Sequence, residues 1–304
     1  MHRNVVMPYK TKTLFLCRSL AGVIFIVSAI LKFLSVDSFE LYIYGLDWFS
    51  LAVSSFLARA LLFAEMSLGI CLLIGLYGRL ASRLSSALLL LFTVFLIYLA
   101  TTGQGDNCHC FGDFVEMDPL ESMGKNVLLG VFIFLGWNLE DWRASWRPAL
   151  LTVVLVGSLV FAFVIKAPYG FGTKNVGYSS DDYAQLVSQH PELKENGKKI
   201  LAFVSTGCKH CKMASRKLNI ALHRAGVSLE PVHWFVIGDS VRFQTFLEET
   251  EVVPFRYDFL PPRDFLKITQ GTLPLILLTE DGKVSKVMSN ATFNENDIVK
   301  FVKE

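Results

Sequence analysis

The chain has 304 residues, of which 52% are hydrophobic, and its formal net charge is only +2 at pH 7. Its mean hydropathy is positive, which is unusual for a soluble protein and indicates membrane-spanning helices. The low net charge and the lack of a basic and aromatic cluster exclude a nucleic-acid partner. We therefore expect a protein of the lipid bilayer.

Five apolar stretches in the first 166 residues each come close to the ~20 residues that cross ~30 Å of hydrocarbon. They are Thr13–Leu34, a stretch within Leu51–Tyr77, Leu84–Ala100, Leu120–Leu139 and Pro148–Ile165. The fourth is weaker because Glu121 and Lys125 lie near its start. The sequence thus predicts a cytoplasmic tail at 1–12 and an α-helical membrane bundle of about five transmembrane helices at 13–166.

Charge between the stretches predicts their orientation. Lys and Arg gather at one set of helix ends, whereas residues 35–50 and 101–124 contain neither. The positive-inside rule places the Lys- and Arg-rich ends in the cytoplasm. Five crossings from a cytoplasmic N-terminus then place everything after Lys166 outside the cytoplasmic (inner) membrane. The first stretch is too long for a signal peptide and lacks a small-residue cleavage site, so we expect it to be retained.

A cysteine pair lies in the outer loop that follows the third stretch. Cys108 and Cys110 flank His109, and thiols so close together form a disulfide only in a tight, strained ring. Strain makes a disulfide easier to reduce, which suits a site of thiol–disulfide transfer. The alternative is a metal site, in which Cys108, His109 and Cys110, with nearby Asp106 and Asp113, bind zinc or copper.

The membrane half resembles a known group of proteins. Residues 22–25 and 28–33 of the first stretch, and 65–70 of the second, look like DoxX-type membrane proteins. The loop at 107–113 is similar to the Cys-x-Cys-Phe-Gly loop of the MauE branch of that group. The resemblance covers about residues 13–140 and implies a four-helix, redox-associated module. In the MauE branch this module is linked to the maturation of disulfide-rich partner proteins.

Ionisable and thiol groups also occur within the stretches. A carboxylate near the middle of a membrane helix is costly, so we expect Glu65 to face the bundle and to pair with Lys32 or Arg59. A proton-handling role for Glu65 is the alternative. Cys17 and Cys71 lie toward the cytoplasmic ends of their helices. They could carry electrons across the membrane, or serve as the small hydrophobes that buried cysteines usually are.

The rest of the chain is soluble in character. Residues 167–192 are predicted as a linker, in which Ser179 to Asp182 cap a short helix that ends near Gln189. Residues 193–304 alternate between strand and helix patterns, which predicts an α/β domain with helices on both faces of a mixed sheet. The expected strands are Lys199–Val204, Val232–Ile237, Leu273–Thr279 and Lys283–Met288.

A second cysteine pair, Cys208-Lys209-His210-Cys211, follows the first of these strands and opens a helix. Free N–H groups and the helix dipole favour a thiolate at Cys208, and Cys211 can resolve a mixed disulfide. A cation at His210, with Lys209 and Lys212, should stabilise the Cys208 thiolate further and make the pair oxidising. A structural disulfide or half of a zinc site is the alternative.

This order of elements resembles the thioredoxin fold, and its TlpA-like secreted members in particular, over about residues 193–304. Residues 271–274 look like the family's cis-proline segment, which implies that Pro274 lies against the cysteine pair. An ordinary trans proline is the alternative. The chain departs from the family at Gly207, which is no aromatic residue, and at Ala202, which stands where thioredoxins carry a buried acid.

Together these features predict a membrane-anchored thiol–disulfide oxidoreductase. Cys208 and Cys211 would exchange electrons with Cys108 and Cys110, and the partners would be exported, Cys-containing proteins. No motif requires a cofactor, but a membrane quinone would accept electrons if the loop pair is reoxidised in the bundle. The direction of flow stays open, with oxidation favoured. The alternatives are a copper- or zinc-binding assembly factor and a non-catalytic, MauE-like accessory protein.

Overall fold

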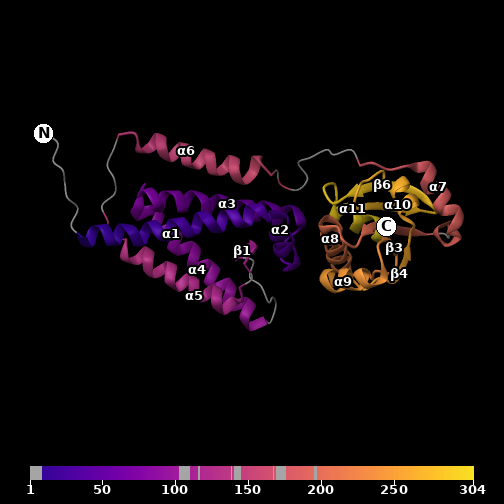
Figure 1. The fold of residues 1–304 in the computed structure, drawn as a ribbon, viewed down its shortest axis with the longest axis horizontal. Coiled ribbons are helices and arrows are strands. Elements are labelled where there is room, and N and C mark those ends of the chain that lie inside the picture. Colours follow the sequence, from indigo (N-terminus) through magenta and orange to yellow (C-terminus); the bar gives the residue numbers. More distant parts are fainter. Residues whose placement is uncertain are drawn as a thin grey trace. The chain divides into compact units, whose positions relative to one another are not determined.

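A computed structural model describes residues 9–102, 110–115, 117–137, 139, 145–166, 168, 176–194 and 197–304. The chain divides into two compact units, residues 1–42 with 55–168 and residues 43–54 with 169–304. The expected fold class is confirmed. An N-terminal bundle of apolar helices precedes an α/β domain with a mixed, five-stranded sheet (Figure 1).

The bundle contains four helices that are long and apolar enough to cross a membrane, at Lys12–Leu34, Leu51–Ile74, Gly78–Thr102 and Arg147–Val164. The elements of this half are α1 (Tyr9–Leu34), α2 (Val36–Gly45), α3 (Leu51–Ile74), α4 (Gly78–Thr102), β1 (Cys110–Asp113), α5 (Pro119–Leu135), α6 (Arg147–Leu159) and a π-helical turn (Val160–Val164). These four match four of the five predicted spans. The remaining one, α5, has 17 residues and lies at the short end of the range for a span.

Small residues let α1 and α3 pack closely. A Cβ atom on Gly22 would lie 2.7 Å from the carbonyl oxygen of Gly69, and one on Gly69 would lie 2.9 Å from that of Gly22. Close backbone contact at small residues is a common way in which membrane helices associate. Around this contact, α1 and α3 to α6 share one apolar core, which includes Ala21, Phe25, Leu72, Leu89, Leu129, Ile133 and Val154.

The outer faces of the bundle are apolar as well. Leu90 of α4, Phe134 of α5 and Val153 of α6 have exposed fractions of 67%, 74% and 66%. Such surfaces would be costly in water but are suited to contact with lipid tails. The pattern agrees with the prediction that these helices lie in a bilayer.

Two segments that the charge pattern marks as loops contain regular structure. Residues 35–50 include α2, and residues 101–124 include β1 and the first turn of α5. Glu121, predicted to weaken the fourth span, belongs to the N-terminal cap of α5. Its backbone N–H donates to Asp118 Oδ1 at 2.7 Å, and its side chain accepts from the Asp118 N–H at 3.2 Å. This reciprocal capping box begins the helix at Pro119.

The C-terminal domain has the strand order β4-β3-β2-β5-β6. Its strands are β2 (Lys198–Ser205), β3 (Val232–Ile237), β4 (Arg256–Phe259), β5 (Leu275–Glu280) and β6 (Lys283–Ser289). Its helices are α7 (Ser180–Gln189), a 3-10 turn (Pro191–Lys194), α8 (Lys209–Ala225), α9 (Ser240–Thr250), α10 (Pro262–Thr269) and α11 (Glu295–Lys303). Strands β2, β3 and β4 are parallel, whereas β5 and β6 run antiparallel to their neighbours. Helices lie on both sides of the sheet (Figure 1).

The core of this domain shows how the sequence builds it. Helix α7 begins at the predicted cap, Ser179, and buries Tyr183 and Leu186 against Phe203 and Phe235 of the central strands. A helix within the predicted linker therefore contributes to the domain core. Helix α8 ends at Gly226, whose φ of +70° favours glycine. The sequence pattern does not predict β4, because this strand has four residues and alternates charged with aromatic side chains.

Candidate functional site

Cys208 and Cys211 lie where β2 passes into α8. Cys208 is the N-terminal cap of α8, and its Sγ accepts a hydrogen bond from the Cys211 N–H at 3.3 Å. The Cys208 side chain is half-buried, whereas Cys211 is completely buried, and both are free thiols. The Cys211 Sγ accepts a hydrogen bond from the Ser205 N–H at 3.4 Å. A disulfide of a partner can therefore reach the first thiol more easily than the second.

The two thiols differ strongly in acidity. The pKa of Cys208 is lowered to about 6 against the effect of burial, and the hydrogen bond from the Cys211 side chain is the largest cause. The backbone N–H groups of Cys211 and His210, and the charge of His210, also lower this pKa. The same thiol–thiol hydrogen bond and burial raise the pKa of Cys211. At pH 7, a thiol with a pKa of 6 is about 90% thiolate, so Cys208 is by far the more ionised thiol of the pair.

The side chains around the pair differ in part from those predicted. His210 contributes to the low pKa of Cys208, but less than Cys211 does, and Lys212 forms an ion pair with Glu249. Asn290 Nδ2 lies 3.4 Å from His210 Nδ1. Asn290 Oδ1 accepts a hydrogen bond from Nζ of the buried Lys217 at 3.0 Å. Neither Asn290 nor Lys217 belongs to the predicted site. Lys217 lies in α8 itself, but only the fold places it beside Asn290, which follows β6 and is distant in sequence.

The peptide bond between Leu273 and Pro274 is cis, as the thioredoxin resemblance implies. Pro274 directly precedes β5, whose first residue, Leu275, pairs with Phe203 of β2. Because β2 leads into Cys208, Pro274 lies at the same end of the sheet as the cysteine motif. Lys209, the other predicted supporting residue, is exposed at the start of α8.

In the bundle, the short strand β1 carries Cys110 and lies against α1. Gly112 has a φ of +65°, and a Cβ atom there would lie 2.1 Å from Ser35 Oγ. The Cys-x-Cys-Phe-Gly motif therefore needs glycine at this position both for its backbone conformation and for the close approach to α1. The Lys125 ammonium lies 4.6 Å from the ring centroid of Phe111, a cation–π contact between α5 and β1.

Cys110 is half-buried in β1, but Cys108 and His109 lie outside the described residues. The predicted exchange of electrons between this pair and Cys208 and Cys211 thus stays a prediction. So does the alternative metal site of Cys108, His109 and Cys110.

Glu65 is buried and forms an ion pair with Lys32, which is one of its two predicted partners. Ser28 joins this pair to β1. Its Oγ lies 3.1 Å from Glu65 Oε2 and 2.9 Å from the Cys110 carbonyl oxygen, and it accepts from Lys32 Nζ at 3.1 Å. The sequence gives Ser28 no role at the site, because only the fold brings α1, α3 and β1 together.

The remaining candidates in the bundle have other surroundings. Arg59, the other predicted partner of Glu65, pairs with Glu40 and donates from Nε to the Lys166 carbonyl oxygen at 3.0 Å. Cys71 is a free thiol within the apolar core of the bundle, and Cys17 is a half-buried free thiol. The surroundings of Cys71 agree with its reading as a small hydrophobe.

Comparison with known proteins finds two similarities. Residues 10–138 match the family described as methylamine utilisation protein MauE. The chain is also 25% identical to Protein TlpB of Flavobacterium psychrophilum in an alignment 308 positions long, which covers 78% of this chain and 83% of TlpB. The wider resemblance to DoxX-type proteins stays a prediction. The chain is thus a multi-pass membrane protein whose N-terminal part is similar to MauE and is followed by a thioredoxin-like domain.

Proposed function

We propose that this protein is a membrane-anchored thiol–disulfide oxidoreductase that forms disulfides in exported, Cys-containing proteins. The observation that carries this proposal is the pair of thiols at the start of α8. Cys208 is half-buried with a pKa lowered to about 6, and Cys211 is buried with a raised pKa. Such a contrast suits a reactive first thiol and a protected second one.

The reaction begins with the Cys208–Cys211 disulfide. A substrate thiolate attacks the sulfur of Cys208, a mixed disulfide forms, and Cys211 leaves as a thiolate that takes up a proton. A second substrate thiolate then attacks the substrate sulfur of the mixed disulfide and displaces the Cys208 thiolate. Two electrons pass from the substrate dithiol to the cysteine pair, and the substrate keeps the new disulfide.

The acidity of Cys208 favours this direction over reduction. Thiol–disulfide exchange is faster when the leaving thiol has a low pKa, and Cys208 is the leaving group in the second step. In the reducing direction, Cys211 would have to attack the mixed disulfide from a completely buried position. A stabilised Cys208 thiolate also favours the dithiol form of the pair, which makes its disulfide a stronger oxidant.

The reduced pair must then be reoxidised, and we assign this role to Cys108 and Cys110. The charge pattern supports a location of both pairs outside the cytoplasmic membrane, on the periplasmic side. Because both belong to one chain, their exchange is intramolecular, at an effective concentration of about mM. A membrane quinone, which is soluble in lipid, would take the electrons from the loop pair.

Trapping of the intermediates tests the proposal. In the full-length Cys211→Ala variant, Cys208 can form a mixed disulfide but cannot resolve it. We expect adducts of Cys208 with Cys108 or Cys110, and with exported proteins, on non-reducing gels followed by mass spectrometry. The variant Cys71→Ser, which alters a thiol of the bundle core, is the control and should give no adducts. Absence of Cys208 adducts, with the wild-type pair fully reduced in growing cells, would contradict the proposal.

A further inference from the structure

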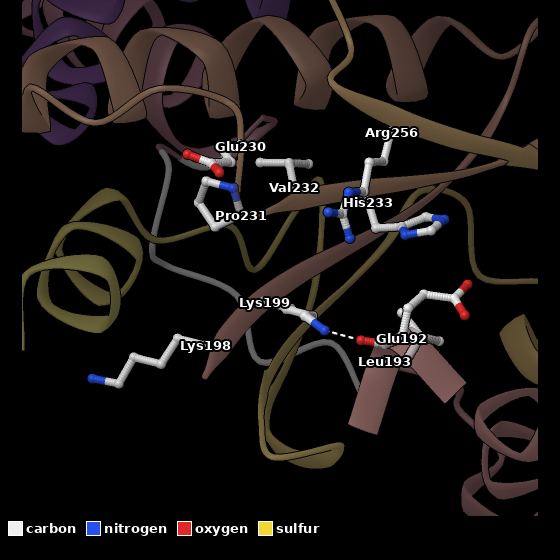
Figure 2. A pocket seen from close by; sticks show the side chains of 9 residues that line it. All are labelled: Glu192, Leu193, Lys198, Lys199, Glu230, Pro231, Val232, His233 and Arg256. Carbon is white, nitrogen blue, oxygen red and sulfur yellow. Dashed lines mark hydrogen bonds between the residues drawn. The ribbon is translucent and has the colours of Figure 1, made fainter. Parts of the chain in front are cut away.

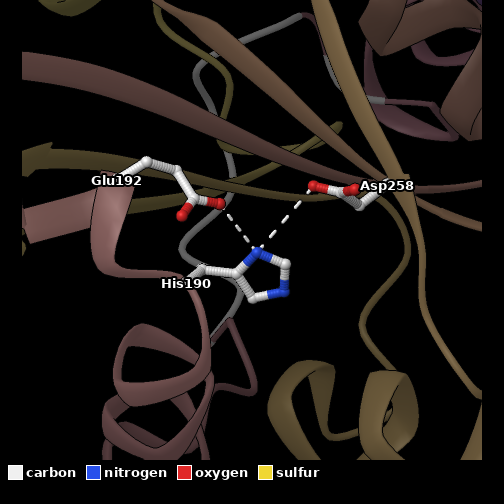
Figure 3. Close-up of side chains that lie close together, drawn as sticks. All are labelled: His190, Glu192 and Asp258. Atoms are coloured by element: carbon white, nitrogen blue, oxygen red, sulfur yellow. Dashed lines mark hydrogen bonds and ion pairs between the residues drawn. The ribbon is translucent and has the colours of Figure 1, made fainter.

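Four polar side chains cluster at one edge of the C-terminal domain and take no part in the thiol chemistry. His190 follows α7, Glu192 lies in the 3-10 turn, and His233 and Asp258 come from the neighbouring strands β3 and β4. Figure 3 shows the imidazole of His190 between the carboxylates of Glu192 and Asp258. We propose that this cluster binds a divalent transition-metal ion of the zinc type, with His190, Glu192 and Asp258 as ligands.

The distances between the donor atoms fit a single ion. His190 Nδ1 lies 2.8 Å from Glu192 Oε1 and 3.9 Å from Asp258 Oδ2, and the three donor atoms all lie within 4.8 Å of one another. Zinc binds nitrogen and carboxylate oxygen at about 2.0–2.2 Å, so two ligand atoms of one ion are at most about 4.4 Å apart. Both distances from His190 already meet this limit, and only a small approach of the two carboxylates would complete the site.

The ligand set also fits the chemistry of such ions. Imidazole suits zinc, copper, iron and nickel, and carboxylates are ligands of zinc as well. Three protein ligands leave one position of a tetrahedral zinc ion for water or another molecule. No cysteine belongs to the cluster, so a metal here would be independent of the redox state of Cys208 and Cys211.

His233 and Phe235 hold the cluster in place. His233 Nε2 lies 2.7 Å from Asp258 Oδ2, and its side chain is only 7% exposed. Its ring stacks on Phe235 at a centroid distance of 4.6 Å, and the ring of His190 meets the same Phe235 edge-on at 5.6 Å. Packed rings lose little freedom on metal binding, and an outer hydrogen bond to a ligand carboxylate raises metal affinity. His233 is thus a positioning residue.

An ion can reach the cluster from solvent, because the side chains of Glu192 and Asp258 are 36% and 44% exposed. A pocket with a volume of about 300 Å³ lies beside the cluster, and Glu192 and His233 form part of its wall (Figure 2). Lys199 also lines it, but its ammonium donates to the backbone carbonyl oxygen of Glu192. The carboxylate of Glu192 therefore remains directed to His190. Glu230 lines the same pocket without belonging to the cluster.

Metal titration of the full-length protein in detergent tests the proposal. The chain is first oxidised with diamide, so that paired cysteines do not bind metal, and is then titrated with Zn²⁺ against a chelating dye. We expect one Zn²⁺ to bind with an affinity that falls at least about 100-fold in His190→Ala, Glu192→Gln and Asp258→Asn. Glu230→Gln, which removes a carboxylate from the same pocket, is the matched control and should bind like wild type.

Cobalt and a second pair of variants define the ligands. Co²⁺ at the site should show visible d–d absorption without the near-ultraviolet charge-transfer band of thiolate ligands. His233→Gln keeps an N–H donor for Asp258, so its loss of affinity should be smaller than the 10- to 100-fold loss expected for His233→Ala. A purely structural role for His233 would give equal losses in both variants.

Thermal unfolding separates loss of the site from loss of the fold. In chelator, Asp258→Asn should unfold near the wild-type temperature, and added Zn²⁺ should stabilise wild type and Glu230→Gln but not Asp258→Asn. The proposal is wrong if the oxidised wild type binds no Zn²⁺. It is equally wrong if His190→Ala and Asp258→Asn bind Zn²⁺ as wild type does, because the cluster would then only be a group of polar side chains around His190.

Discussion

Replacing Cys211 should change the acidity of Cys208 more than replacing His210. The hydrogen bond from the Cys211 side chain is the main cause of the low pKa of Cys208, whereas the charge of His210 is the smallest of its causes. With a pKa of about 6, Cys208 is about 90% thiolate at pH 7, against about 3% for a thiol with the usual pKa of ~8.5. A complete return to the usual pKa would thus lower the thiolate fraction at pH 7 about 30-fold.

The pH dependence of alkylation measures this difference. The reduced, full-length protein is treated with iodoacetamide in detergent, and modification of the Cys208 peptide is followed by mass spectrometry. We expect a half-maximal rate near pH 6 in wild type, a clear upward shift in Cys211→Ala and a smaller shift in His210→Gln. Cys211→Ser is the matched control, because its hydroxyl can still donate, and it should lie between wild type and Cys211→Ala.

Midpoints are compared instead of absolute rates, because the intrinsic nucleophilicity of a thiolate rises with its pKa. The sign of the effect on stability follows from the same shift. The pKa of Cys208 is lower in the folded dithiol form than in the unfolded chain. Ionisation of Cys208 therefore adds to the free energy of unfolding, and this contribution grows from about pH 6 to about pH 8.5 and is lost below pH 6. A wild-type midpoint near pH 8.5, or a shift in His210→Gln as large as that in Cys211→Ala, would refute the reasoning.

Two further predictions concern the bundle. Glu65→Gln leaves the buried Lys32 without its counter-ion, so it should destabilise the bundle by about 3–5 kcal/mol. The loss should appear as a lower unfolding temperature in detergent. In the double variant, Lys32→Met should restore much of this stability. An unchanged unfolding temperature in Glu65→Gln would show that the pair is not buried. Gly22→Val places a Cβ atom 2.7 Å from the Gly69 carbonyl oxygen and should lower the free energy of unfolding by about 1–3 kcal/mol or more. A Cβ atom at Gly124 meets no atom within 4 Å, so Gly124→Val should lower it by less than about 1 kcal/mol in the same measurement. Equal costs in the two glycine variants would argue against a tight contact between α1 and α3.

Segments with a strong hydrophobic pattern could be predicted from the sequence of this chain, and segments without one could not. The strand β3 and the helix α8, with its end at Gly226, carry strong hydrophobic patterns and a clear stop signal. By contrast, β4 has four residues and α2 has ten, and neither has a hydrophobic pattern that sets it apart from the adjacent residues. Such elements form because the rest of the fold offers them a partner, such as β3 in the case of β4.

The same contrast applies to the side chains of the sites. The spacing of Cys208 and Cys211 and the helix after them predict a reactive thiol, because the relevant contacts lie within one turn of chain. The spacing does not predict which contact lowers the pKa of Cys208 most. A sequence shows a charged residue such as His210 directly, but it does not show a hydrogen bond between two thiols. The cluster of His190 and Asp258 joins a turn to an edge strand, and only the fold reveals it.

The contacts of Ser28 indicate how the buried ion pair of the bundle acts on the loop cysteines. The Ser28 hydroxyl carries one proton but lies within hydrogen-bond distance of both Glu65 and the Cys110 carbonyl oxygen. Lys32 donates to both Ser28 and Glu65, so the three side chains form one network beside the Cys110 carbonyl oxygen. This network reaches the backbone of Cys110 and not its thiol. The pair of Lys32 and Glu65 therefore positions the strand that carries Cys110, and its charge need not enter the exchange of electrons.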